Sequence, residues 1–524
     1  MQSFLKEKQN IKVLLEMRPA LEGFAGIPQE VRLLFRGLCK IDSIDVEGMI
    51  QTSHRVLAKG TKERGFLRRN LTAARKINRY SRVIISLAEK PYRNVLGVVQ
   101  DWLEKRFSMY KLFLQVSFGA GRITLTRFES NLFKDFTWST LFAKTLPASD
   151  FLLVSSANHR ICSVPWNLMH KVGLQSLNVF PAPKYPILDT RGFQVFIGQT
   201  PYPARVDSET ALVIRYHDAI PVFMPHTISD KSNHQATHFY ALMDNVKSGA
   251  WFACVSEATR HDLLRLFPEA GGRAVTIHNM VSHHYFLEES PRSRVPEIIK
   301  SRNYGNDPDA GDIGLMPKFL SLSEQENFYS EKALGSDFNY LLIVSTIEPR
   351  KNHSRLLAAW EVIKAEVDPD MKIVVVGTLG WDFKQIFKGF KTWIDRGDLF
   401  MLNAVPAPDL RVLYCHAAAT VCPSLGEGFD FSGVESMASG GVTVASDIPV
   451  HREVYDNAAE YFDPYSTVSL VKALKKVLYD DDAVETRNRM REHGRDVASR
   501  YTPERILPQW DTFLNRIVGI GASE

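Results

Sequence analysis

The fold is decided by the stretch ATVCPSLGEGFDFSGVESMASGGVTVAS, residues 419–446. Its first four residues predict a buried strand, its middle predicts a loop entering a helix, and Val442 to Ser446 predict a second strand. Glu427 stands in the loop and Glu435 in the helix. N–H groups at a helix start suit phosphate oxygens, and a carboxylate further along accepts hydrogen bonds from sugar hydroxyls. This arrangement predicts a nucleotide-sugar site, with two solvated surface glutamates as the alternative.

The same block resembles the E-x7-E signature of family 4 of the retaining glycosyltransferases (glycosyltransferase group 1), and in particular its mannosyltransferase-like branch. The resemblance continues through residues 447–454 and 459–464. It implies an α/β protein of the GT-B fold, in which two Rossmann-like domains face each other across a cleft. The resemblance covers most of the chain, and its most specific motifs lie in the second half.

Length and composition are those of a globular protein. The 524 residues suffice for about three average domains or two large ones, and 45% are hydrophobic and 23% charged. No stretch approaches the eighteen or so apolar residues of a spanning helix, and the first ten residues lack a signal-peptide core. The five cysteines are widely spaced and odd in number, which favours reduced thiols. We therefore expect a cytoplasmic protein, either free or peripheral at the inner face of the cytoplasmic membrane.

The alternation of predicted strands and helices divides the chain into four parts. We expect residues 1–286 to form an N-terminal Rossmann-like domain on the acceptor side, with a basic helical insertion at about 55–145. Residues 287–337, rich in Pro, Gly, Ser and charge, are predicted to be a linker with an insertion. Residues 338–500 should form the C-terminal nucleotide-sugar-binding domain. The resemblance implies that residues 501–524 contain a helix crossing back to the first domain.

Within the N-terminal part, a strand at 11–16 leads into a glycine loop containing Gly26 and Gln29. The resemblance places this loop against the cleft, and a simple tight turn is the alternative. Further strands are predicted in the same domain by short apolar runs, at 150–155, 211–216, 251–256 and 274–278.

The segment from Arg55 to Arg82 is strongly basic. It has ten basic residues and one acid, Glu63, so its net charge is 10 − 1 = +9. Such a segment attracts polyanions: an anionic membrane surface, a lipid-diphosphate acceptor or a nucleic acid. Nucleic acid is disfavoured because no aromatic ladder or known motif accompanies the charge. We expect peripheral membrane association through this segment, with a solvated helical face as the alternative.

Arg350 and Lys351 follow the first predicted strand of the C-terminal domain. Ligands of open α/β sheets bind at the carboxyl ends of strands, where these two cations can neutralise a diphosphate. They match the basic donor-phosphate motif of the family. Cations already in place stabilise the charge that develops on a leaving nucleoside diphosphate. Alone, such a pair would more often face solvent.

The resemblance assigns roles within the glutamate block. Glu435 binds the ribose hydroxyls of the donor, and Glu427, with the backbone of Gly428 and Phe429, lies against the transferred sugar. The run 430–433 departs from the commonest family pattern, which leaves the sugar open. Asp430 is expected either to contact a sugar hydroxyl or to cap the helix.

His217 and Asp218 follow a predicted strand and resemble a His-Asp-x-x-Pro segment of the family. His217 is expected to donate to a sugar hydroxyl or to developing charge, with a purely structural histidine as the alternative. Asp218 could orient the imidazole, cap the next segment or, with the glycine loop, face the acceptor. His234 and His238 are four residues apart but lack the glutamate of a zinc-protease helix, so we expect no metal and no cofactor.

These inferences predict a retaining glycosyltransferase. It would move a sugar, mannose or a related hexose, from a nucleotide-sugar donor to a glycan or lipid-linked acceptor in bacterial surface polysaccharide synthesis. The alternatives are a catalytically inactive GT-B scaffold and another GT-B enzyme, such as an epimerase or a phosphorylase. An epimerase would lack the Arg-Lys motif, and a phosphorylase would need a pyridoxal-binding lysine that the sequence does not reveal.

Overall fold

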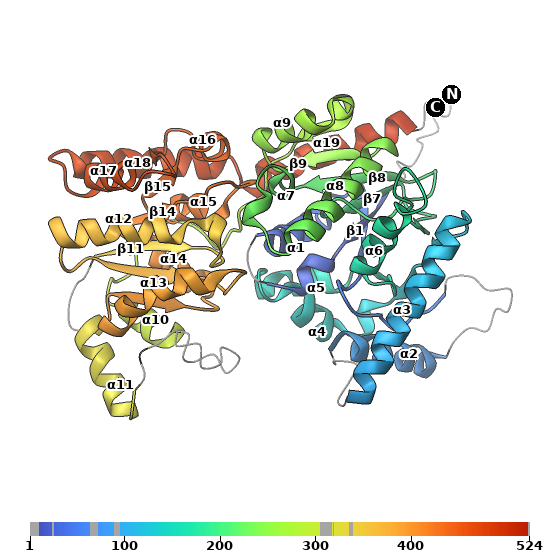
Figure 1. The fold of residues 1–524 in the computed structure, drawn as a ribbon, viewed down its shortest axis with the longest axis horizontal. Helices are drawn as coiled ribbons and strands as arrows, with labels where there is room; N and C mark the ends of the chain where they lie inside the picture. Colours follow the sequence, from blue (N-terminus) through green and yellow to red (C-terminus); the bar gives the residue numbers. More distant parts are fainter. Residues whose placement is uncertain are drawn as a thin grey trace, which may run out of the picture.

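The computed structural model describes two α/β domains that lie side by side, each built on a largely parallel sheet (Figure 1). The described residues are 10–23, 26–62, 72–88, 95–303, 317, 319–334 and 339–521. The sequence therefore predicted the fold class correctly, because strands buried on both faces read as continuous apolar runs.

The N-terminal sheet has eight strands within the described ranges, in the order β10-β9-β8-β7-β1-β2-β5-β4. Its centre is β1, where Val13 pairs with Val46 of β2 on one side and with Val195 of β7 on the other. The strands are β1 (Ile11–Glu16), β2 (Ile44–Ile50), β4 (Thr126–Phe128), β5 (His159–Ile161), β7 (Val195–Gly198), β8 (Ala211–Tyr216), β9 (Trp251–Cys254) and β10 (Ala274–Thr276), with a separate pair β3 (Arg122–Ile123) and β6 (Ile187–Leu188).

Helices cover both faces of this sheet. Two apolar clusters result, one under α1 and the other under α6 and α8. The helices are α1 (Ile27–Leu38), α2 (Ala73–Ala88), α3 (Val95–Ser117), α4 (Lys134–Thr137), α5 (Phe151–Ser155), α6 (Trp166–Ser176), α7 (Ile220–Phe223), α8 (Lys231–Lys247) and α9 (Glu257–Leu266).

Two expectations for this domain need correction. Residues 150–155 were predicted as a strand, but they form the short helix α5, and the strand is β5, a few residues later. Within α5, Val154 is buried while Leu152 is exposed, so only one side of this apolar run is buried. Periodicity cannot separate a strand from a helix in so short a run. The basic insertion is not purely helical either, because β4 adds an antiparallel edge strand to the main sheet.

The C-terminal sheet has the order β13-β12-β11-β14-β15-β16 in the described part of the chain. The deciding stretch forms strand, helix and strand as predicted, and β14 pairs with β11 through Leu341 and Ala419. The strands are β11 (Tyr340–Val344), β12 (Lys372–Val376), β13 (Leu399–Leu402), β14 (Ala419–Cys422), β15 (Thr443–Ser446) and β16 (Ala459–Phe462).

Helices also pack on both faces of the second sheet (Figure 1). They are α10 (Arg294–Arg302), α11 (Leu322–Tyr329), α12 (His353–Glu366), α13 (Phe383–Arg396), α14 (Ala407–His416), α15 (Phe431–Ala438), α16 (Pro449–Tyr455), α17 (Thr467–Leu478) and α18 (Ala483–Ser499). Part of the predicted linker is thus ordered, because Val295, Ile298 and Ile299 of α10 are buried in the core of this domain.

The last helix, α19 (Pro503–Gly521), returns to the N-terminal domain (Figure 1). Trp510 and Phe513 are buried in the core around α1 and β1. Leu507 lies so close to Gly37 that a Cβ there would meet its side chain at 2.4 Å. The chain therefore closes on the domain in which it began, and α19 ties the two domains together.

Candidate functional site

The centre of the site is an ion-pair cluster at the carboxyl ends of β11 and β14. Arg350 and Lys351 stand in a tight turn that follows β11. Arg350 Nη1 lies 2.8 Å from Glu427 Oε2, and Lys351 Nζ donates to Glu427 Oε1 at 2.6 Å. Arg350 also donates to Glu348 Oε1 at 2.7 Å and to the Gly426 carbonyl at 2.7 Å. Two motifs 76 residues apart meet because their strands are neighbours in a parallel sheet.

The turn itself is held by its last residue. Asn352 has a left-handed backbone (φ 57°), which asparagine tolerates better than most residues. Its side-chain amide donates to the carbonyls of Pro423 (3.1 Å) and Pro464 (2.9 Å). Arg350 and Lys351 are thereby fixed against the loop that carries Glu427.

The cluster is neutral overall, since two cations face Glu348 and Glu427. Burial would raise the pKa of Glu427, but Arg350 and Lys351 outweigh it and hold the pKa below its usual range. Burial likewise opposes the charge of Arg350, yet Glu427 and Glu348 raise its pKa further above the ordinary value. Glu348 has a raised pKa because burial dominates there. The cations therefore stay charged, and their present counter-ions are carboxylates of the protein.

Glu435 lies on α15 and is turned toward the N-terminal domain. Its Oε1 accepts a hydrogen bond from Gln29 Nε2 of α1 at 2.8 Å, and its Oε2 accepts one from the Tyr414 hydroxyl at 3.2 Å. Burial raises the pKa of Glu435 to about 7, although these hydrogen bonds oppose the shift. Two predicted site residues from opposite domains, 406 positions apart, are thus in direct contact.

The loop between the two glutamates passes very close to the N-terminal domain. A Cβ at Gly428 would lie 1.9 Å from the His217 carbonyl oxygen, and one at Gly426 would lie 2.7 Å from Met224 Sδ. At Gly428 glycine is therefore required by the close approach of backbone rather than by backbone conformation. The Phe429 ring packs against aromatic side chains in a small core, so only its backbone faces the loop.

Asp430 caps α15. Its Oδ1 accepts hydrogen bonds from Ser432 N (3.3 Å) and Ser432 Oγ (2.7 Å), and its Oδ2 lies 3.2 Å from His451 Nε2. Burial acts to raise the pKa of Asp430, but Lys351, His451 and Ser432 together lower it well below the usual range. Of the two roles expected for Asp430, the structure shows the helix cap.

His217 and Asp218 form the N-terminal side of the site, where β8 ends. Asp218 Oδ1 accepts a hydrogen bond at 3.0 Å from the N–H of Ile220, the first residue of the short helix α7. Burial raises the pKa of Asp218, while Arg350 across the domain boundary opposes the shift and Glu427 adds to it. Asp218 is therefore within electrostatic range of the cation cluster.

His217 carries no charge at neutral pH. Burial and the nearby Arg215 lower the pKa of its imidazole to about 3, and a hydrogen bond to the Gln199 backbone only partly offsets this. Its Nε2 has no hydrogen-bond partner among the residues that the structure describes. A neutral imidazole with one unpaired nitrogen suits a hydroxyl group better than a phosphate.

A group of polar side chains surrounds this position, and we call it the neutral cluster: Gln199, Trp166, His170, Tyr216, His217 and His238. Of these, the sequence analysis named only His217 and His238. Each member of the neutral cluster has at least one buried side-chain nitrogen or oxygen without a hydrogen-bond partner in the described part of the chain. Gln199 directly follows β7, and both of its amide atoms are unpaired. The apolar run at 195–198 ending in a glutamine could have signalled it, but that strand was not recognised.

The cluster is held together by ring contacts. The Trp166 and His170 rings lie 4.1 Å apart, and those of Tyr216 and His238 lie 6.0 Å apart. Burial lowers the pKa of His170 and of His238, the latter to about 3. The imidazoles are therefore neutral, like that of His217. Such a set offers hydrogen bonds without charge.

Gly26 begins α1 with a left-handed backbone (φ 70°), which glycine adopts without strain. Among the described residues, no heavy atom outside its neighbours would lie within 4 Å of a Cβ there. The helix start places Gln29 one turn later against Glu435, at the boundary with the other domain.

The two domains also touch around the rim of the site. Glu453 of α16 accepts hydrogen bonds from the backbone N–H groups of Glu257 (2.6 Å) and Ala258 (2.8 Å) at the start of α9. His278 Nε2 lies 2.8 Å from the same carboxylate. On the other side, Trp381 Nε1 donates to the Thr227 carbonyl at 2.9 Å. These contacts connect the domains on both sides of the cation cluster.

Three comparisons with known proteins agree with this geometry. Residues 324–497 match the family model described as glycosyl transferases group 1. The chain is 26% identical over 241 residues to O-antigen chain mannosyltransferase B of Escherichia coli, which covers 46% of this chain and 55% of that protein. It is 32% identical over 171 residues to O-antigen chain mannosyltransferase RfbU of Salmonella typhimurium, which covers 32% of this chain and 44% of that protein. The chain spans about half the length of these curated relatives.

Among solved structures, a sucrose-phosphate synthase from Thermosynechococcus elongatus superposes with a TM-score of 0.55 at 13% identity, covering 98% of this chain and all of that one. Anabaena Alr3699/HepE in complex with UDP-glucose superposes with a TM-score of 0.50 at 12% identity, covering 98% and 100%. At such identities the likeness concerns the fold. The likeness shows the two-domain GT-B fold. Residues 324–497 match the model of the group 1 glycosyltransferases, and the chain is similar to O-antigen chain mannosyltransferases.

Two further expectations concern membranes and metals. In the described ranges, no helix is long and apolar enough to cross a membrane. No group of three or more His, Cys, Asp and Glu side chains that could hold a metal occurs in the same ranges. Part of the basic segment from Arg55 to Arg82, residues 63–71, lies outside the described residues.

Proposed function

We propose that this protein is a retaining glycosyltransferase that moves a hexose, with mannose as the first candidate, from a nucleotide-sugar donor to a hydroxyl group of a growing bacterial surface glycan. The proposal of mannose and of a surface glycan rests on the relatives, two of which are O-antigen chain mannosyltransferases. All five cysteines lie in the described ranges and are free, which supports a reducing compartment on the cytoplasmic side.

The observation that carries the proposal is the convergence of Arg350 and Lys351 on Glu427 beside the start of α15. A donor diphosphate placed here would form ion pairs with Arg350 and Lys351, which are now paired with carboxylates of the protein. Both cations are held in place by the turn and by burial, so little reorganisation is needed as charge builds on the leaving nucleoside diphosphate. Preorganised charge of this kind stabilises the transition state more than the ground state.

Retention in this proposal needs no nucleophile from the protein. Both oxygens of Glu427 are engaged by cations and its pKa is lowered, which makes it a poor nucleophile toward an anomeric carbon. We propose that the acceptor hydroxyl attacks on the face that the diphosphate leaves. The C–O bond to the new glycan forms as the bond to the phosphate oxygen breaks, and that phosphate oxygen takes the acceptor's proton. No metal ion or cofactor takes part.

The remaining predicted residues have matching roles in the proposal. Glu435 would accept hydrogen bonds from the donor ribose, in exchange for the one from Gln29. His217, neutral and with an unpaired Nε2, would bind a hydroxyl of the transferred sugar, and the glycine loop would let the sugar approach the backbone of Gly428 and Phe429. Gly26, Gln29 and Asp218 would border the acceptor side.

A thermal-shift screen of GDP-, UDP-, ADP- and dTDP-sugars identifies the donor, because a ligand that binds the folded state raises its apparent stability. We expect GDP-mannose to give the largest shift. Transfer to a mannose-containing oligosaccharide should follow, should persist in EDTA and should yield an α-linked product by NMR. Failure of every nucleotide sugar to shift the protein, or a product of inverted configuration, would refute the proposal.

A further inference from the structure

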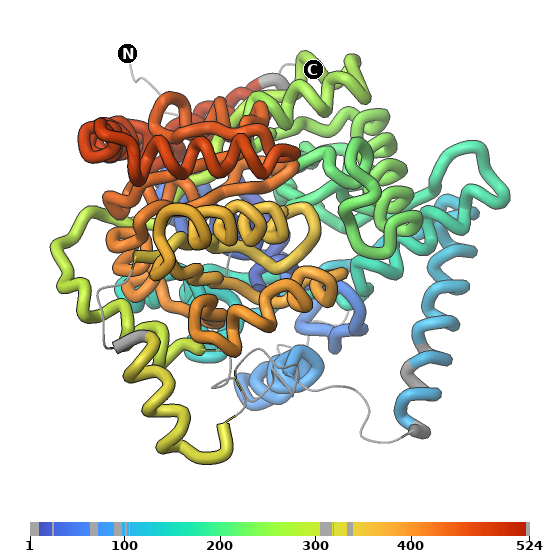
Figure 2. The backbone as a smooth tube through the Cα atoms, turned by 60° about the vertical axis from the view of Figure 1, so that its left-hand side comes forward, coloured from blue at the N-terminus to red at the C-terminus, as the bar shows by residue number. Residues whose placement is uncertain are grey.

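Helix α3 lies at the edge of the N-terminal domain and stands apart from the body of the molecule (Figure 2). Its inner face is well packed: Leu112 and Val116 are buried in the cluster that also contains Leu168 and Met169 of α6. Apolar side chains also lie on its exposed side, although a soluble helix normally turns its apolar side chains toward the core.

The exposed side chains of this face form one stripe, which we call the outer row: Val99, Leu103, Phe107, Tyr110 and Leu114. Their side chains are between 47% and 72% exposed. They follow one another at intervals of three or four residues, which places them on a single face of the helix. A contiguous apolar stripe of this kind marks an interaction surface on a soluble protein.

The helix that precedes α3 in the chain is cationic. Helix α2 carries Arg75, Lys76, Arg79 and Arg82 and no acidic residue, and its Ile77 and Ile85 are exposed. Helix α2 and the start of α3 both lie at the lower end of the N-terminal domain in Figures 1 and 2. Apolar and basic side chains on one side of a domain are the composition of an interfacial membrane anchor.

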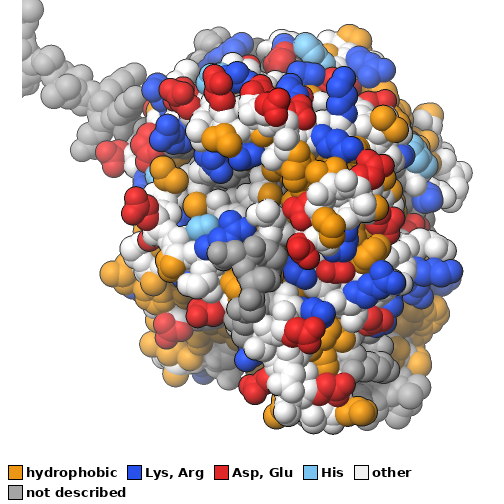
Figure 3. Space-filling view, turned by 90° about the vertical axis from the view of Figure 1, so that its left-hand side faces the viewer, with side chains coloured by type: hydrophobic (Ala, Val, Ile, Leu, Met, Phe, Trp, Pro, Cys, Tyr) orange, Lys and Arg blue, Asp and Glu red, His pale blue; other side chains and the backbone are white. Residues whose placement is uncertain are grey.

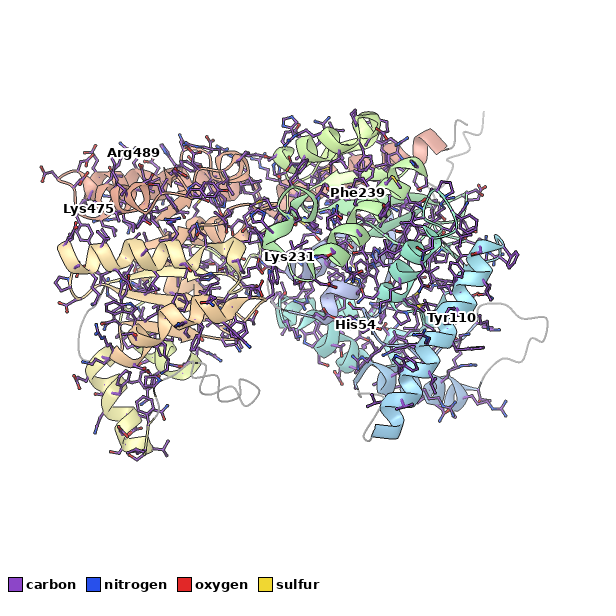
Figure 4. The ribbon with its side chains drawn as sticks, viewed as in Figure 1. His54, Tyr110, Lys231, Phe239, Lys475 and Arg489 are labelled. Atoms are coloured by element: carbon purple, nitrogen blue, oxygen red, sulfur yellow. The ribbon has the colours of Figure 1, made fainter. Side chains whose placement is uncertain are left out.

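A pocket of about 300 Å³ opens between α3 and α6, next to the outer row. It is lined by Trp102 and Arg106 of α3, Lys171 of α6 and His54. Arg106 lies over the rings of Trp102 (5.3 Å) and Tyr110 (5.6 Å), so it connects the pocket with the outer row. Figure 4 labels His54 and Tyr110 on this part of the domain. Cations around a small concavity suit a phosphate headgroup.

We propose that α3 docks the enzyme on an anionic lipid bilayer. The outer row enters the headgroup and acyl boundary, and the pocket between α3 and α6 binds a lipid phosphate. The sequence analysis expected membrane association through the charge of the segment from Arg55 to Arg82. The present proposal instead assigns it to an apolar anchor with a defined headgroup site. The proposal stands independently of the transfer reaction, since docking is measured on the protein without donor or acceptor.

The charges argue for lipid rather than a second copy of the chain. A two-fold dimer through the outer row would use the same patch on both subunits and would bring one cationic surface against another. An anionic bilayer instead complements these cations and attracts them over the Debye length.

Vesicle co-sedimentation tests the proposal, with phosphatidylcholine vesicles and with vesicles containing added phosphatidylglycerol. We expect binding to the anionic vesicles and weaker binding at high salt. The variant Leu103→Ser, Phe107→Ser, Leu114→Ser should bind roughly tenfold more weakly or worse, because less apolar surface is removed from water. The matched control, Val468→Ser with Val484→Ser, removes exposed apolar side chains of 79% and 63% exposure from α17 and α18 and should bind like the wild type.

The pocket is tested separately by Arg106→Ala with Lys171→Ala, which should lower the preference for phosphatidylglycerol while leaving residual binding to both vesicles. Circular dichroism and Tm verify that each variant is folded, as expected for exposed positions. Unchanged binding by the outer-row variant would overturn the proposal. The proposal would also be overturned if the wild type did not bind vesicles but formed a dimer, and if the outer-row variant were a monomer. The outer row would then bind a second copy of the chain.

Discussion

The two domains present opposite chemistry to the space between them. The C-terminal side is charged and already paired: Arg350 and Lys351 hold Glu427, with Glu348 beside them. The N-terminal side carries the Asp218 carboxyl together with neutral, unpaired groups: His217 Nε2 and both amide atoms of Gln199 are buried without partners among the described residues. Charges are most useful where negative charge develops, whereas neutral donors and acceptors discriminate hydroxyl patterns. In the proposed function, the C-terminal domain binds the diphosphate and the N-terminal domain binds sugar hydroxyls.

The outer surfaces differ as well. The face of the C-terminal domain in Figure 3 carries acidic and basic side chains interspersed over its upper part, and ion pairs such as Lys475–Glu366 and Lys476–Glu460 contribute to this mixture. In the N-terminal domain, α2 is purely cationic and α3 purely apolar on its outer row. A mixed surface suits solvent, whereas the segregated one suits a bilayer.

Removing the cations should have the largest effect. Arg350→Ala or Lys351→Ala should lower transfer on the order of 10²-fold or more, the scale of losing one preorganised electrostatic donor. Steady-state kinetics with the identified donor measures this. Arg452→Ala is the matched control, because Arg452 pairs with Asp447 on the surface. If the variant with both changes, Arg350→Ala and Lys351→Ala, turned over like the wild type, the two cations would not bind the donor diphosphate.

The second test separates the two glutamates. Glu435→Ala should weaken binding of the free nucleoside diphosphate, whereas Glu427→Ala should reduce turnover more than nucleotide affinity. Isothermal calorimetry with the nucleotide alone, set beside the turnover of each variant, distinguishes them. If both changes weaken nucleotide binding equally, the assigned roles are wrong.

The raised pKa of Glu435 predicts a pH-dependent stability. The folded carboxyl has a pKa of about 7 against an ordinary value of 4.5, so the folded state binds more protons in that window. Its contribution is complete below pH 4.5 and is lost as the pH rises through 7. Glu435→Gln should therefore gain stability relative to the wild type at pH 8 but not at pH 4.5, by at most roughly 3 kcal/mol.

Denaturant unfolding of the wild type and Glu435→Gln at both pH values measures this difference. Glu460→Gln is a control, because Glu460 pairs with Lys476 near the surface. A difference between wild type and Glu435→Gln that is the same at both pH values would mean that Glu435 is already charged at low pH.

The smallest expected effect concerns the neutral side. Gln199→Leu replaces an amide whose two polar atoms are buried and unpaired. It should raise the free energy of unfolding by about 1 kcal/mol, because a desolvated polar group is removed. Transfer should nevertheless fall by roughly tenfold if the amide binds a sugar hydroxyl. A stabilised variant with full transfer would assign Gln199 to the scaffold and leave His217 as the hydroxyl-binding residue.

By itself, the sequence determined the local parts of the site. Strand, loop and helix at 419–446 are contiguous, and the charge pair 350–351 follows a strong apolar run, so period and residue type sufficed. Only the tertiary structure decided which groups are buried together. Gln29 meets Glu435 across 406 positions, and Gln199 is fully buried with both of its amide atoms unpaired in the described part of the chain. Burial and hydrogen-bond partners determine each pKa and which polar atoms remain unpaired. Both depend on contacts between residues far apart in the chain, which a local stretch of sequence does not specify.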